Sequence, residues 1–500
     1  MRTAGVLMPI FSLPGKYGIG TFGEEAYRFV DFLKKSGQTY WQILPLSPTS
    51  YGDSPYQSFS AYAGNPYFID FDLLKKDGYL CEEEYADIDW GKQDSIDYSL
   101  LYQKRFAVLK RAYFRFLQNI PDDYRKFLID NKVWLDDYAL FMALKNANDG
   151  KSFVNWDESI KKRDKSALNE AVKLYGEDVE FFKILQYLFE KQWFALKKYA
   201  NENGVYIIGD IPIYVAYDSA DVWCEPEQFY LDKDLVPIEV AGCPPDDFSI
   251  SGQLWGNPIY NYKYMKNSAN PYDWWCRRIE YTLKLYDVIR IDHFRGFESY
   301  YAIPFGDKDA TGGSWRKGPG IAFFKHLKKK FGDLPIIAED LGFMTDEVKK
   351  MLEQSSFPGM KVLEFAFDSK SDSEYLPHNC HKNCVVYTGT HDNDTIIGWQ
   401  NTLSKEDLKF AKEYMNAGES ENLNWPMIRT AYATSSDTVI IPMQDFLGLD
   451  SKARINIPST LGNNWCWRID GCCINDWLAG IINELTKTYR RIPVAKKESK

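Results

Sequence analysis

The sequence predicts an α/β fold, a (β/α)8 TIM barrel with inserted, largely helical subdomains. Three observations support this prediction. Eight short apolar runs recur along the chain, a polar or glycine-rich loop follows most of them, and helical patterns separate them. A chain of 500 residues is long enough for one barrel that carries insertions. We therefore expect residues 1–500 to form a single barrel domain.

The first unit shows the local pattern. Residues 5–10 resemble a buried strand, and Thr21 and Glu24 have the spacing of a capping box, in which each side chain satisfies a free backbone N–H. Apolar residues then recur from Ala26 to Leu33 at helical spacing, and Gly37 is expected to end that helix. The next strand is predicted over residues 41–46.

Similar runs predict the remaining six strands, over residues 205–213, 287–292, 335–339, 361–367, 384–388 and 438–442. The last helix is expected over residues 476–490, with an apolar face formed by Trp477, Leu478, Ile481, Ile482 and Leu485. Eight buried strands that alternate with helices favour a closed barrel over an open sheet.

Two intervals are too long to be simple connections. Residues from about 72 to 178 carry helical patterns and are expected to form an inserted helical subdomain. Residues from about 214 to 286 are rich in aromatic side chains. Because loops of this length in a compact enzyme usually serve function, we expect this second insertion to be an active-site loop region.

Composition excludes several classes of protein. Lys and Arg total 60 and Asp and Glu total 70, which gives a net charge of −10 and argues against nucleic acid or an anionic membrane as partner. We find no apolar run that could span a bilayer, and Pro9 interrupts the short apolar stretch near the start, so no signal peptide is expected. An odd count of nine cysteines fits reduced thiols in the cytoplasm. The aromatic fraction of 16% suits either a large core or flat sugar ligands.

Acidic side chains stand where predicted strands end. Asp292 and Glu339 close two strands, and Asp392 follows another. Because function in such barrels lies at the carboxyl ends of the strands, we expect the three carboxylates on one rim. Glycosyl transfer needs such a set, with one carboxylate to attack the anomeric carbon and another carboxyl to protonate the leaving oxygen. Arg290 is expected on the same face as Asp292 and to keep it ionised, whereas the apolar run before Glu339 would raise its pKa.

Long motifs in these regions closely resemble the amylomaltases, which are 4-α-glucanotransferases related to the α-amylase clan. The resemblance covers nearly the whole chain. Its main motifs are residues 290–296 (RIDHFRG), 338–342 (AEDLG) and 389–395 (GTHDNDT), and further ones are residues 53–57, 64–67, 209–215, 252–258 and 453–458. The resemblance implies a retaining double displacement on maltooligosaccharides or linear α-1,4-glucans, without metal or organic cofactor.

The same resemblance assigns roles to individual residues. Asp292 is the expected nucleophile, Glu339 the general acid/base, and Asp392 the third catalytic carboxylate, which grips sugar hydroxyls. The expected substrate-binding residues are Ser54, Tyr56, Asp210, Trp255, Arg290, His293, Asp340, His391 and Asn456. Two of these have alternatives: Asp210 would equally serve to brace the rim, and Asp340 would face away if its strand continued. Residues 241–248 resemble the flexible loop over the site.

Other interpretations stay open at this point. The same carboxylates would serve an α-1,4-glucan hydrolase, because only the acceptor differs. A non-catalytic glucan-binding barrel is a less favoured alternative, since the set of three carboxylates is complete. Residues 378–384 (HNCHKNC) mimic a metal or redox cluster, but their spacing fits no standard zinc pattern. The sequence leaves open whether the protein is a monomer or a homo-oligomer.

Overall fold

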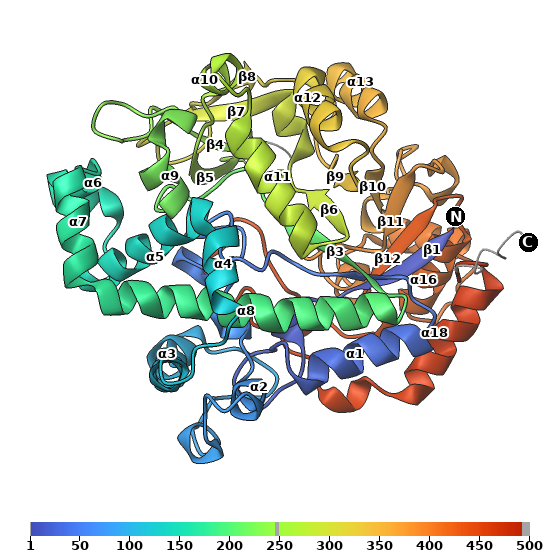
Figure 1. The fold of residues 1–500 in the computed structure, drawn as a ribbon. Coiled ribbons are helices and arrows are strands. Elements are labelled where there is room, and N and C mark those ends of the chain that lie inside the picture. Colours follow the sequence, from blue (N-terminus) through green and yellow to red (C-terminus); the bar gives the residue numbers. More distant parts are fainter. Residues whose placement is uncertain (1, 246–249, 493–500) are drawn as a thin grey trace, which may run out of the picture.

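A computed structural model describes residues 2–245 and 250–492 and contains the predicted barrel (Figure 1). Neighbouring strands of its eight-stranded sheet are parallel, in the order β10-β11-β12-β1-β2-β3-β6-β9. The strands are β1 (Thr3–Leu7), β2 (Tyr40–Gln42), β3 (Tyr206–Ile211), β6 (Val288–Ile291), β9 (Ile336–Ala338), β10 (Gly359–Val362), β11 (Cys384–Tyr387) and β12 (Thr438–Pro442). Each lies in or overlaps one of the eight predicted runs, so the predicted fold class is confirmed.

The two ends of the sheet order, β9 and β10, meet and bring the barrel close to closure. Ala338 N donates to the carbonyl of Pro358 at 2.9 Å. Asp340 Oδ1 accepts a further hydrogen bond from Met360 N at 2.5 Å. A side chain therefore contributes to the junction between these two strands.

The interior of the barrel is apolar. Its side chains come from alternating positions of the strands, which is how barrels of this kind fill their centre. The buried cluster comprises Leu7, Ile208, Ile337, Met360, Val362, Val385, Tyr387 and Ile440. Within this cluster the Tyr387 hydroxyl donates to the buried Gln42 side chain at 2.8 Å, near the ends of β11 and β2.

Strand and helix ends differ from the predictions in detail. Pro9 follows β1, and residues Ile10–Ser12 form a 3-10 helix instead of the end of the predicted strand. The first helix, α1 (Glu24–Lys35), buries its predicted face, but its N-cap is Gly23. The predicted capping box is wrong, because the Thr21 hydroxyl donates to Asp70 Oδ2 at 2.6 Å instead of capping the helix.

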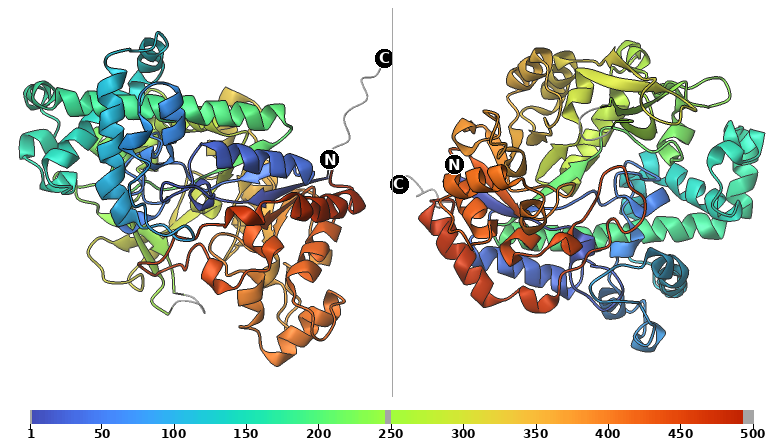
Figure 2. Two further views of the ribbon diagram at one scale, coloured as in Figure 1. Left: turned by 90° about the horizontal axis from the view of Figure 1, so that it is seen from below. Right: turned by 180° about the vertical axis from the view of Figure 1, so that it is seen from behind.

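The last helix, α18 (Asp476–Thr488), packs beside α1 on the outside of the barrel (Figure 2). Leu478 and Ile482 are buried, whereas Trp477 is 74% exposed, so its prediction on the apolar face is wrong. Beyond the helix, the guanidinium of Arg491 is buried and donates to the carbonyls of Thr3, at 3.1 Å, and Tyr432, at 3.0 Å. Thr3 belongs to β1, which pairs with β12. Arg491 therefore connects the segment after α18 with the first strand of the barrel.

A helical region separates β2 from β3, in the interval where the sequence predicts a helical insertion. It contains α2 (Phe71–Lys76), α3 (Tyr98–Phe116), α4 (Tyr124–Asp130), α5 (Lys132–Ala147), α6 (Glu158–Lys161), α7 (Lys165–Leu174) and α8 (Gly176–Glu202). The long helix α8 packs against α5 at one end and against α1 and β3 toward the other (Figure 1). It therefore belongs to both the inserted helices and the barrel wall.

A second, antiparallel sheet lies beside the barrel and was not predicted. Its strand order is β5-β4-β7-β8, and it combines β4 (Glu239–Cys243) and β5 (Gln253–Pro258) with β7 (Ser299–Pro304) and β8 (Ser314–Lys317). The first two strands precede β6 and the last two follow it, so two separate loops of the barrel build one small sheet. Helices α9 (Ala220–Cys224), α10 (Tyr262–Asn267) and α11 (Asp273–Leu285) complete the interval between β3 and β6.

The remaining helices are α12 (Ile321–Phe331), α13 (Asp346–Ser355), α14 (Ile396–Gln400), α15 (Lys405–Tyr414), α16 (Asn424–Ala433) and α17 (Met443–Leu447). In the part of the chain that the structure describes, we find no helix with the length and apolarity needed to cross a membrane.

Candidate functional site

The first part of the site is an ion-pair cluster at the ends of β3 and β6. Asp210 and Arg290 occupy paired positions on these strands, and both are almost fully buried. Arg290 Nη1 donates to the two oxygens of Asp210 at 2.8 and 2.7 Å and to Asp292 Oδ1 at 3.0 Å. One guanidinium therefore joins a buried carboxylate to the one that follows the strand.

Two effects oppose each other at Asp292. Burial is the larger one, because it disfavours the charged form and raises the pKa of Asp292 to about 6. Arg290 acts in the opposite direction, whereas the charges of Asp210 and Asp392 add to the increase. With this pKa the carboxylate of Asp292 is mostly ionised at neutral pH, as a nucleophile requires.

Glu339 follows β9, the neighbour of β6 in the barrel. Its Oε2 accepts from His293 N at 2.7 Å, and its Oε1 accepts from Leu341 N at 2.7 Å. His293 adopts a left-handed backbone conformation, with φ of 52°. Burial and then the charge of Asp292 raise the pKa of Glu339 to about 7. This carboxyl can therefore both give and take a proton near neutral pH.

Asp392 stands in the loop after β11, and its side chain is partly exposed. Asn456 Nδ2 donates to Asp392 Oδ1 at 2.6 Å, and His391 Nε2 lies 3.3 Å from Asp392 Oδ2. Both carboxylate oxygens thus have a neighbour that fixes their direction, and the exposed edge remains available to a ligand.

Two aromatic side chains frame these carboxylates. The Tyr56 hydroxyl donates to Asp210 Oδ2 at 2.8 Å, and its ring stacks on His391 at 5.0 Å between centroids. Trp255, from β5 of the small sheet, meets the ring of His293 edge-on at 4.8 Å. The small sheet therefore contributes to the site, although the sequence did not predict it.

His293 itself carries an unsatisfied polar atom. Its Nε2 is buried and has no hydrogen-bond partner within the described residues. Burial lowers the pKa of His293 to about 3, so the imidazole is neutral. A buried polar atom without a partner is costly, so the unpaired Nε2 of His293 is a feature that a ligand hydroxyl would satisfy.

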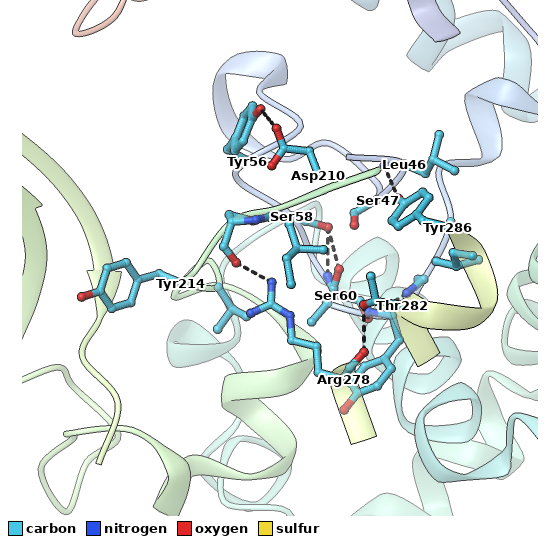
Figure 3. A pocket seen from close by; sticks show the side chains of 18 of the residues that line it. Leu46, Ser47, Tyr56, Ser58, Ser60, Asp210, Tyr214, Arg278, Thr282 and Tyr286 are labelled. Atoms are coloured by element: carbon cyan, nitrogen blue, oxygen red, sulfur yellow. Dashed lines mark hydrogen bonds between the residues drawn. The ribbon is translucent and has the colours of Figure 1, made fainter. Parts of the chain in front are cut away.

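A small cavity lies behind this site, on the far side of Asp210. Figure 3 shows Tyr56 and Asp210 at one end and Ser58, Ser60 and Arg278 toward the other. Its volume of about 30 Å³ suits one or two water molecules and is far too small for a sugar ring. This cavity is therefore not a sugar-binding site.

The other predicted binding residues lie in different places. The Ser54 hydroxyl accepts from Tyr56 N at 3.2 Å and shapes the loop that presents the tyrosine. Asp340 is directed to the junction of β9 and β10, where a Cβ at Gly359 would lie 2.6 Å from its Oδ2. Its carboxylate is thus engaged by the backbone of β10 through Met360 N. The predicted loop 241–248 is described only up to residue 245, so its positions 246–248 lie outside the described residues.

The structure adds Arg454 to this site, a residue to which the sequence alone gave no role. Its Nη2 donates to the carbonyl of Asp392 at 2.7 Å, and its Nε donates to the carbonyl of Asn456 at 2.8 Å. Its position in the sequence, two residues before the predicted binding residue Asn456, could have indicated that it lies near the site. By contrast, in residues 2–245 and 250–492 no three His, Cys, Asp or Glu side chains are placed to hold a metal ion, including those of segment 378–384.

Comparison with known proteins gives the family. The model of the 4-alpha-glucanotransferase family matches residues 8–474. The 4-alpha-glucanotransferase of Clostridium butyricum is 51% identical over 487 residues, which cover 97% of this chain and 100% of that protein. That of Streptococcus pneumoniae is 47% identical over 496 residues and 98% of both chains.

Solved structures agree with this relationship. The amylomaltase from Streptococcus agalactiae, solved in complex with acarbose, matches with a TM-score of 0.96 and 46% identity, covering 98% of this chain and 100% of that one. The amylomaltase from Corynebacterium glutamicum shares the fold, with a TM-score of 0.76, 19% identity, and 98% and 74% of the two chains covered. The chain belongs to the 4-α-glucanotransferase family of enzymes.

Proposed function

We propose that this glucanotransferase moves α-1,4-glucan segments between maltooligosaccharides by a retaining double displacement, with Asp292 as nucleophile and Glu339 as general acid/base. The observation that carries the assignment is the pair of partly buried carboxyls that directly follow the neighbouring strands β6 and β9. Arg290 contacts one of them, whereas the other accepts from two backbone N–H groups. Their environments therefore differ, as two roles in one reaction require.

In the first half-reaction the carboxylate of Asp292 attacks the anomeric carbon of the donor glucan. Glu339 gives its proton to the glycosidic oxygen, and the reducing-end fragment leaves as an alcohol. The remaining glucan is then an ester of Asp292. The pKa of Glu339, which burial raises to about 7, leaves a large fraction protonated for this step.

In the second half-reaction Glu339 is ionised and takes the proton from the 4-hydroxyl of an acceptor glucan. That oxygen displaces Asp292 from the anomeric carbon and forms a new α-1,4 bond. Each displacement inverts the anomeric centre, so the two together retain its configuration. The carboxylate of Asp292 and the proton of Glu339 are both restored.

The surrounding residues suit a neutral sugar. Asp392, held by Asn456 and His391, offers acceptor oxygens to ring hydroxyls. Tyr56 and Trp255 supply apolar faces of the kind on which sugar rings pack. The acarbose complex of the Streptococcus agalactiae amylomaltase supports an oligosaccharide ligand for a site of this construction. The net charge of −10 and the odd number of cysteines support a cytoplasmic enzyme acting on uncharged glucans.

Incubation with maltotriose tests the proposed substrate and reaction. Disproportionation yields glucose together with oligosaccharides longer than maltotriose, resolved by chromatography. Glucose and maltose with nothing longer would instead establish hydrolysis, and absence of products would favour a binding protein. Asp292→Asn tests the nucleophile: we expect turnover to be abolished while circular dichroism stays that of the wild type. Full activity of that variant would refute the assignment.

A further inference from the structure

A buried carboxylate outside the proposed catalytic set, that of Asp445, accepts hydrogen bonds from both ends of the loop that carries Asp392. Asp445, in α17, is 1% exposed. Its Oδ2 accepts from the Thr388 hydroxyl at 2.6 Å, and its Oδ1 accepts from Ile396 N at 2.9 Å. Thr388 directly follows β11, and Ile396 begins α14. The two residues enclose the loop 389–395, which carries His391 and Asp392.

The same loop rests on a second buried carboxyl. Glu364 N donates to the carbonyl of Thr388 at 3.1 Å. Its side chain fills the space beside Gly389, where a Cβ would lie 2.9 Å from Oε1. Within the loop, Asn393 accepts from Thr390 N at 3.0 Å. The loop therefore has little freedom on its inner side while both contacts hold.

Arg454 and Asn456 hold the outer side of the loop. Arg454 donates to the carbonyl of Asp392, and Asn456 donates to its carboxylate. These two contacts hold Asp392 against residues 454–456, but they do not hold the two ends of the loop in position. Within the described residues, Asp445 is the side chain that is hydrogen-bonded to both ends of the loop, at Thr388 and at Ile396.

We propose that Asp445 is a positioning residue of the transfer reaction, which sets the Asp392 carboxylate against the sugar by clamping the two ends of its loop. The proposal rests on the proposed role of Asp392 in binding the sugar. Asp445 does not face the substrate, since it is buried behind the loop. Its effect is therefore exerted through Asp392, and that dependence can be measured.

Asp445→Ala removes both anchors at once. A displacement of about 1 Å in a binding group lowers turnover on the order of 100-fold, so we expect kcat/KM on maltotriose to fall between about 10- and 100-fold. Asp445→Asn is the conservative variant. Its amide oxygen still accepts from Ile396 N, and its amide N–H donates to the Thr388 oxygen. We therefore expect it to restore kcat/KM to within about threefold of the wild type.

The chain offers a matched control. Asp70 is buried like Asp445 and makes the same two kinds of contact, accepting from the Thr21 hydroxyl at 2.6 Å and from Leu73 N at 3.0 Å. It touches none of the proposed site residues. Asp70→Ala should lower the melting temperature about as much as Asp445→Ala and leave kcat/KM unchanged. Equal losses of activity in both variants would mean that destabilisation alone explains the effect.

A binding cycle tests the route through Asp392, with acarbose as the probe and titration calorimetry as the readout. We expect Asp445→Ala to weaken acarbose binding about 10-fold or more in the wild-type background and less than twofold when Asp392→Asn is already present. Equal weakening in both backgrounds would overturn the proposal. If Asp445→Ala does not fold, Thr388→Val removes one anchor and should show the same dependence. Disproportionation of maltotriose by the wild type is measured first, so failure of the proposed function is recognised separately.

Discussion

Arg290 offers the sharpest test of the electrostatics at this site. Arg290→Met keeps most of the side-chain volume and removes the charge that contacts Asp210 and Asp292. Asp210 is then a buried carboxylate without its ion-pair partner, and such a loss costs about 3–5 kcal/mol of unfolding free energy. We therefore expect a clear loss of stability in addition to the effect on catalysis.

The catalytic effect follows from the pKa of Asp292. Burial raises this pKa and Arg290 lowers it, and the result is a value of about 6. A contacting arginine lowers an aspartate pKa by about 1–3 units, so its removal should bring Asp292 to about 7–9. At pH 7 the ionised fraction then falls from about 90% to between about 50% and about 1%. Because the nucleophile must be ionised, the acidic limb of the kcat/KM profile should move to higher pH.

The assay is a profile of kcat/KM on maltotriose from pH 5 to 9, with glucose release as the signal, together with unfolding in urea. Glu339 limits any recovery at high pH, because it must be protonated to give its proton to the leaving oxygen and it ionises as the pH rises. The maximum activity should therefore fall at every pH, and the optimum should move upward.

Arg278→Met is the matched control for this prediction. Arg278 is also buried, but it donates to the carbonyls of Pro212 and Ile213, at 2.6 and 3.0 Å. The control should lose stability without any shift of the acidic limb. If Arg290→Met loses stability with an unmoved limb, Arg290 is only structural and the reasoning on Asp292 is refuted.

Three further predictions follow from the structure. The pKa of Glu339 is raised in the folded state, so this residue costs stability that grows as the pH rises from the unfolded pKa of about 4.3 to about 7 and stays constant above that. Glu339→Gln should therefore stabilise the protein by about 1–3 kcal/mol at pH 8 and by nearly nothing at pH 4, as urea unfolding would measure. Trp477→Gln should change the unfolding free energy by less than about 0.5 kcal/mol, because the side chain is exposed. Leu478→Ala, at the adjacent buried position, should cost about 2–5 kcal/mol. A large loss in the Trp477 variant would contradict the exposed placement of this side chain. Tyr56→Phe keeps the ring and should leave KM for maltotriose within about threefold. Tyr56→Ala removes the ring face and should raise KM by about 10-fold, which corresponds to a loss of about 1.4 kcal/mol of binding. Equal KM values in the two variants would exclude a stacking role.

Much of the barrel could be predicted because its strands are buried on both faces and therefore appear as apolar runs, such as residues 438–442. Their ends could not, since they depend on hydrogen bonds to partners elsewhere: Pro9 ends the ladder of β1, and the predicted strand at 361–367 passes into a 3-10 helix at Leu363–Phe365. The small sheet escaped prediction because β4 and β7 pair across more than 50 residues, with β6 between them. Trp477 was misplaced because helical spacing alone does not define where the buried face ends.

The carboxylates of the candidate site could be predicted from position, because Asp292 and Glu339 stand directly after an apolar strand and Asp392 lies in the loop that follows another. Their partners were harder to find. Asp445 lies within a helix and contacts residues 57 and 49 positions away, so no local pattern connects it with Asp392. Asp340 shows the reverse case: the family resemblance implied a ligand contact, whereas in the structure its carboxylate accepts from the backbone of β10.

The contact between Arg491 and the first strand has a consequence for synthesis. During translation the N-terminal strands emerge first, but β1 lacks its neighbour until residues 438–442 have left the ribosome, and the buried guanidinium that joins them comes later still. Contacts that join such distant positions form slowly, and without β12 both β1 and β11 present an unpaired edge. We expect nascent chains that lack Arg491 to be the most prone to aggregation and the most dependent on a chaperone. Activity should appear only after β12 and Arg491 have joined β1.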